Sequence, residues 1–266
     1  MDQPNNSENR MDNPLAFIFT NSQGNLIFSD QKFIQDLGDK SANIQSGEPL
    51  HALLLMDSNT EKQLIEAVKK KSIVENMAVS YSTAAGNTVK SNSTIIAAVD
   101  ENGNFLGMDL VLKNESHPNN LSDTETKIMT HFDVIKAYVE MEMNSRNPVK
   151  PRTFTQSYLV AQFNMLQIML ARIGGSASRQ TFEKLANSTA GSMGLPIYME
   201  NGHLNFSKKD IDIQGYRSLL QTTSNYAVIV VGRNIVKQEM LLVDIFVGHG
   251  TLELISQMDL RIFSAE

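Results

Sequence analysis

Histidine is the residue type in this sequence best suited to metal binding or proton transfer, because the 266-residue chain contains no cysteine. The five histidines lie in separate segments, and no two of them have the spacing that places imidazoles on one face of a helix or strand. They are His51, His117, His131, His203 and His249. The sequence therefore predicts no metal site. The lack of cysteine excludes disulfides, thiolate nucleophiles and Cys-based zinc or iron–sulfur centres.

Short motifs of the common enzyme classes are also missing from the sequence. The chain has no GxSxG nucleophile elbow, no HExxH zinc motif and no GxGxxG turn after a predicted strand. Gly174-Gly175-Ser176 lacks the Lys-Ser/Thr pair that completes a phosphate-binding loop. We therefore expect a protein that acts by binding and not by catalysis.

The elements that must position any binding residues begin with residues 13–33, NPLAFIFTNSQGNLIFSDQKF. Two runs of strand formers flank a polar turn at residues 21–24, which predicts a β-hairpin. Ser29 and Asp30 then predict the cap of a short helix that ends at Gly38. A second helix is expected over residues 59–71, with three lysines at the end where the helix dipole favours cations.

Three further strands are expected at residues 73–84, 88–99 and 105–113, with apolar and polar residues alternating in the first of them. In this order of hairpin, short helix, irregular loop, GEPLHALL, longer helix and three strands, residues 13–113 resemble a PAS domain. The resemblance implies a five-stranded antiparallel sheet with flanking helices. One sheet face would enclose a core or ligand cavity, and the semi-apolar other face would meet a flanking helix or a second subunit.

The resemblance also implies which side chains line the cavity. The candidates are Phe33, Leu37, His51, Leu54, Ile65, Met77, Val79, Tyr81, Ile95, Met108 and Leu110. We expect no cofactor, with two alternatives: haem through His51, or flavin held without a cysteine adduct. A colourless small-molecule ligand fits the pattern as well.

A connecting segment follows at residues 114–150. Ser122, Asp123 and Glu125 form a capping-box pattern that predicts a helix over residues 124–143. An apolar stripe on this helix follows 4-3-4 spacing and consists of Ile128, Phe132, Ile135 and Val139. The stripe is typical either of a dimer or signalling helix that contacts a second chain, or of an amphipathic helix docked on its own domain.

Residues 151–266 form a mainly helical output domain in the sequence prediction, and they resemble no family that we identify. Helices are expected over residues 154–173, over residues 176–190 from a Ser176 or Ser178 cap, and over residues 210–222. Apolar or amphipathic segments follow at residues 226–247 and 251–263, and a hairpin is expected at residues 197–206. The predicted fold class is α+β, with residues 1–12 as a disordered leader.

Charge and hydropathy limit the function classes. Residues 1–149 carry 12 basic and 20 acidic side chains, a net charge of −8, whereas residues 150–266 carry 11 and 9, a net charge of +2. This balance argues against nucleic acid as a partner. No apolar run approaches the roughly 20 residues that span a bilayer, so a cytoplasmic location is expected.

The sequence therefore predicts a cytoplasmic, bacterial signal-transduction protein. In it, a PAS sensor or dimerisation module, expected to be a homodimer, controls a helical domain that contacts a protein partner. One alternative is a transcription regulator with a winged-helix-like rear domain, although its recognition segment at residues 181–192 has one lysine and no arginine. Another is an atypical phosphotransfer protein using His131, although kinase ATP motifs are missing after residue 150.

Overall fold

The computed structural model of the protein describes residues 15–38, 47–114, 128–144, 152–207 and 212–263. The predicted leader at residues 1–12 and the cap at residues 122–125 lie outside these ranges. In the N-terminal part the strands are β1 (Leu15–Thr20), β2 (Leu26–Ser29), β3 (Ile73–Ser82), β4 (Thr88–Val99) and β5 (Phe105–Asn114). The helices there are α1 (Gln31–Leu37), α2 (Leu50–Leu53) and α3 (Ser58–Lys71).

The five strands form one antiparallel sheet with the order β2-β1-β5-β4-β3. This confirms the predicted α+β fold with a five-stranded sheet. The local signals also agree with the structure, since the Asp30 side chain caps α1 by accepting from the Phe33 amide at 2.8 Å. Asp57 caps α3 in the same way through the amides of residues 59 and 60.

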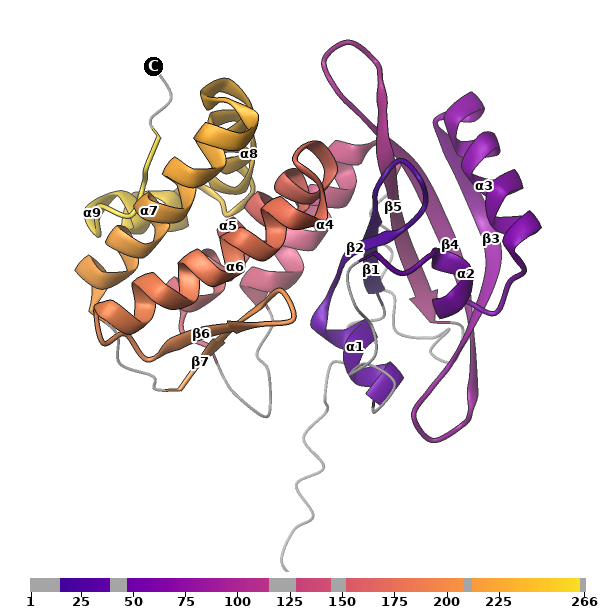
Figure 1. Ribbon diagram of the computed structural model, residues 1–266, viewed down its shortest axis with the longest axis horizontal. Coiled ribbons are helices and arrows are strands. Elements are labelled where there is room, and N and C mark those ends of the chain that lie inside the picture. The colour runs from indigo at the N-terminus through magenta and orange to yellow at the C-terminus, as the bar shows by residue number, and fades with distance from the viewer. Residues whose placement is uncertain (1–14, 39–46, 115–127, 145–151, 208–211, 264–266) are drawn as a thin grey trace, which may run out of the picture.

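The sheet is buried on both faces because its side chains alternate between two cores. On one face, Ile18 and Ile95 both lie opposite Leu110 and pack against α1, α2 and α3. On the other face, Phe19 and Ile96 both lie opposite Asp109 and belong to the core of the helical part. Figure 1 shows the helical part on one side of the sheet and α3 on the other.

The helical part contains α4 (His131–Asn144), α5 (Phe154–Ile173), α6 (Gly175–Ser192), α7 (Ile213–Val231), α8 (Arg233–Phe246) and α9 (His249–Gln257). Its hairpin consists of β6 (Ile197–Glu200) and β7 (His203–Phe206), as predicted, with positive φ angles at Asn201 and Gly202. A tight two-residue turn requires such angles.

Helix α5 is the centre of the helical part (Figure 1). Sixteen of its 20 residues are buried, and it contacts α4, α6, α7 and α8 as well as strands β2, β5 and β7. A helix that is apolar on all sides must be surrounded by other elements. Its start is fixed by a capping box between Thr153 and Gln156.

Three sequence predictions in the helical part are wrong. Helix α4 begins at His131 and not at residue 124, because Thr130 and Asp133 cap each other's amides at 2.9 and 3.2 Å. Helix α6 begins after Gly174 with no side-chain cap, so neither predicted serine caps it. The helix expected over residues 210–222 continues to Val231, and the apolar segment expected over residues 226–247 is divided by Gly232, at a φ of 96°, into the end of α7 and all of α8.

One glycine in the sheet has no room for a side chain. Gly107, in β5, has a φ of +155°, and a Cβ atom placed on it would lie 1.9 Å from the carbonyl oxygen of Thr20. Gly86, in the β3–β4 turn, has a φ of +79° and nothing within 4 Å of such an atom. Close approach of β5 to the end of β1 therefore requires glycine at position 107.

We predict that Gly107→Ala lowers the free energy of unfolding by about 3 kcal/mol or more, since the backbone around Thr20 must move. Gly86→Ala, which meets only the unfavourable φ, is expected to cost about 1 kcal/mol. Urea unfolding followed by circular dichroism measures both values. Equal losses in the two variants would contradict the steric explanation.

Candidate functional site

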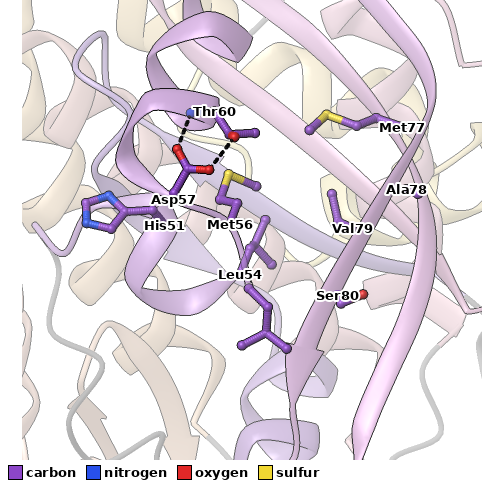
Figure 2. Close-up of a pocket in the computed structure, with 10 residues that line it drawn as sticks. His51, Leu54, Met56, Asp57, Thr60, Met77, Ala78, Val79 and Ser80 are labelled. Atoms are coloured by element: carbon purple, nitrogen blue, oxygen red, sulfur yellow. Dashed lines mark hydrogen bonds between the residues drawn. The ribbon is translucent and has the colours of Figure 1, made fainter.

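A groove of about 610 Å³ opens between the segment that joins α2 to α3 and the edge strand β3. Figure 2 shows the walls of this groove, with Met56 and Met77 facing one another across it. Residues of the α2–α3 wall are His51, Leu54, Leu55, Met56, Asp57 and Thr60, and those of the strand wall are Met77, Ala78, Val79 and Ser80. The lining combines apolar side chains with hydroxyl, carboxylate and imidazole groups, and its polar and apolar parts are of similar extent.

A backbone hydrogen bond joins the two walls of the groove. The Leu55 amide donates to the Ser80 carbonyl oxygen at 2.7 Å, which ties the α2–α3 segment to the edge of β3. The His51 ring lies at the rim, pointing away from Met77 in Figure 2. Its Nδ1 atom is 2.5 Å from a carboxylate oxygen of Glu61, whose other oxygen accepts the Leu50 amide at 2.8 Å. His51 is therefore tied to α3 and lines the groove only at its rim.

The sequence-predicted cavity residues lie together, but most of them fill a packed core. Nine of the eleven are buried in one cluster: Phe33, Leu37, Leu54, Ile65, Val79, Tyr81, Ile95, Met108 and Leu110. Met77 is partly buried against this cluster, and His51 is half-buried at its edge. Only His51, Leu54, Met77 and Val79 line the groove.

A second constellation lies on the opposite sheet face, where the helical part docks. Asp109 of β5 has no exposed surface and forms ion pairs with His131, the first residue of α4, and with Arg172 in the last turn of α5. Arg172 also donates to the carbonyl oxygens of Thr20 and Met108, each at 3.2 Å. One carboxylate thus joins the sheet to two helices. We call Asp109, His131 and Arg172 the junction triad.

Each charge of the junction triad stabilises the ionised form of its oppositely charged partner. Burial alone would raise the pKa of Asp109, but the positive charges of Arg172 and His131 outweigh it and lower that pKa from 3.8 to about 2. Burial would lower the pKa of His131, but Asp109 outweighs burial and raises it above 6.5. The stability that Asp109 contributes is therefore present above about pH 4 and lost only as the pH falls toward 2.

Sequence reasoning singled out His131 for a different role and missed its two partners. A signal for them exists: Asp109 is the one charged residue in FLGMDLVL, and Arg172 is the one charged residue in residues 154–173. An isolated charge inside an otherwise apolar strand or helix is expected to be paired when that element is buried. The sequence does not show which charge pairs with which.

Further contacts join the sheet to the helical part. Arg179 of α6 donates to the Ile27 carbonyl oxygen at 2.7 Å, and the ring of His203 packs on Phe28 with centroids 5.4 Å apart. Burial, with nearby arginine charges, lowers the pKa of His203 to about 4, so this ring is neutral at physiological pH.

The apolar stripe on the connecting segment packs against the rest of its own chain. Ile128, Ile135 and Val139 are buried in the core shared with the sheet. Phe132 is 47% exposed, and its ring packs edge-on against Phe246 with centroids 4.7 Å apart. Of the two sequence interpretations, the structure describes the helix docked on its own chain. Three of the four stripe residues are not accessible to a second chain, and a signalling role for α4 stays a prediction.

No family model and no curated protein matches the chain. The N-terminal domain has a PAS-like fold. Solved structures similar to the chain include a PAS domain of an HTR-like protein from Haloarcula marismortui, with 14% identity and a TM-score of 0.32 over 39% of this chain and 88% of that chain. The strand order of the sheet, and not this low score, carries the assignment of the fold.

Within the ranges that the structure covers, no helix combines the length and apolar character needed to span a membrane. In the same ranges, His51, His131 and His203 join no cluster of three potential metal-ligating side chains. The helical part is not assigned to a known family.

We predict that Asp109→Asn lowers the free energy of unfolding by about 3 kcal/mol, because it leaves the buried cation of Arg172 without its carboxylate. Asp57→Asn removes the same charge from the surface, and asparagine caps a helix as well as aspartate, so its expected cost is under about 0.5 kcal/mol. Urea unfolding at neutral pH measures both. A loss for Asp109→Asn no larger than for Asp57→Asn would show that the ion pairs contribute nothing.

Proposed function

We propose that the protein is a sensory or regulatory protein in which the PAS-like domain receives a small-molecule signal and the helical part passes it to a protein partner by contact, without catalysis. The observation that supports this most is the double use of one sheet. Its first face closes the core beside the groove, and its second face is the docking surface of α4 and α5. A sheet in this position can connect an event in the groove to the helices.

The connection from the groove to the junction triad crosses two strand pairs. Met77, in the groove wall, pairs with Ser93 of β4, whose hydroxyl donates to the Met77 carbonyl oxygen at 2.9 Å. In β4, Ile96 pairs with Asp109 of β5. Displacement of β3 would therefore be passed to the strand that carries Asp109. The physical mechanism is a shift between two arrangements of the sheet, biased by whether the groove is occupied.

The lining of the groove indicates the class of ligand. Leu54, Met56 and Met77 offer an apolar, adaptable surface, while Thr60 and Ser80 offer hydroxyl groups at the margins. We propose a small organic molecule that has both an apolar part and polar groups. A cytoplasmic location, assembly as a homodimer and contact of the helical part with a protein partner stay predictions from the sequence.

We predict that a small molecule co-purifies with the protein and that Met77→Trp, which fills the groove, removes most of it. Met193→Trp is the matched control, because Met193 is 41% exposed on the helical part, away from the groove. Mass spectrometry of the solvent extract identifies and counts the bound molecule, and an absorption spectrum reveals haem or flavin. A wild-type extract with no ligand, or equal occupancy in both variants, would contradict binding in this groove.

A further inference from the structure

His131 is the member of the junction triad that can change its charge near neutral pH. Its side chain is 29% exposed, so protons reach it, whereas the Asp109 side chain has no exposure and that of Arg172 has 4%. The charged groups that face it come from three elements: Asp109 of β5, Arg172 of α5 and Glu239 of α8. When Glu239 is ionised and His131 is protonated, the cluster holds two positive charges and two negative charges. When His131 is neutral, the two carboxylates face one arginine, and the cluster has a net negative charge.

We propose that His131 is a pH-responsive latch, which pins the first turn of α4 to the sheet while it is protonated and releases that turn as the pH rises above neutrality. The latch uses the interdomain contact on which the proposed function depends, but it needs no ligand in the groove. It is a regulatory device of the docking surface itself.

The direction of the response follows from the surroundings of His131. Its pKa in the folded protein is raised by Asp109 against burial, so the stability gained from the pairing is fully present below about pH 6.5 and is lost as the pH rises through the raised value. Burial is the main cause that raises the pKa of Glu239. Once ionised, Glu239 attracts His131 and raises its pKa, so it supports the protonated form and the contact is lost only when His131 itself loses its proton.

The geometry of α4 limits the release to its first turn. His131 lies at the N-terminus of the helix, where the dipole disfavours a cation, so the charged form there depends on the ion pair with Asp109 and on the nearby carboxylate of Glu239. Beyond that turn, Ile135, Tyr138 and Val139 are buried in the shared core and do not titrate near neutral pH. These apolar contacts keep the rest of α4 docked when the latch opens.

The absence of cysteine allows the movement to be measured with two introduced labels. Met129, 47% exposed just before α4, and Lys70, exposed on α3 across the sheet, are replaced by cysteine and spin-labelled in the full chain. Double electron–electron resonance should give a narrow distance distribution at about pH 6 and a broader one at about pH 9. An unchanged distribution across this range would overturn the proposal.

Two substitutions at position 131 have opposite expected results. His131→Gln, which carries no charge, should show the broad distribution at both pH values, and His131→Lys, which stays charged, should show the narrow one at both. His203→Gln is the matched control and should keep the wild-type response, because His203 is neutral throughout this range. If His131→Gln does not fold, His131→Lys decides the question. A pH response in His131→Lys as large as in the wild type contradicts the latch, whatever the groove binds.

Discussion

The sheet must be covered on both faces, and this constraint shapes the whole molecule. Strand β5 places Leu110 toward α1–α3 and its neighbour Asp109 toward the helical part. An ionised carboxylate with no exposure is tolerated only beside compensating charges. Arg172 and His131 supply them from two helices, so the register of β5 also fixes where α4 and α5 dock. The PAS-like domain and the helical part thus share a core.

Helix α5 fixes how the helices are arranged on the covered sheet. Its apolar surface can be buried against many neighbours, so hydrophobic burial alone does not choose its rotation. Its buried polar side chains do: Gln162 donates to the Met240 carbonyl oxygen, Asn164 to the Tyr138 hydroxyl and Gln167 to the Gly202 carbonyl oxygen. Each bond fixes α5 relative to a different element. With Arg172 at its end, this helix links the sheet to α4, α8 and the β6–β7 hairpin.

The sequence predicted the elements that depend on local signals. Alternating strands, the Asp30 cap and the bounds of α5 follow from patterns within a few residues, and the hairpin near Gly202 follows from turn chemistry. The start of α4 was predicted too early, because Thr130 offers the same cap chemistry as the Ser122 of the prediction and several such residues precede the helix. The junction triad joins positions 109, 131 and 172, and no periodic pattern reports contacts between such distant residues. The groove was only partly predicted, since the same apolar residues serve to fill a core or to line a cavity.

Hydrogen–deuterium exchange of the wild type and of Met77→Trp, compared peptide by peptide at one pH, tests most directly whether the groove communicates with the helices. The account predicts altered protection in β5, the first turn of α4 and the end of α5, because β4 and β5 carry the change across the sheet. Changes confined to α2, α3 and β3 would contradict it. The helical part would then be docked on the PAS-like domain without responding to the groove.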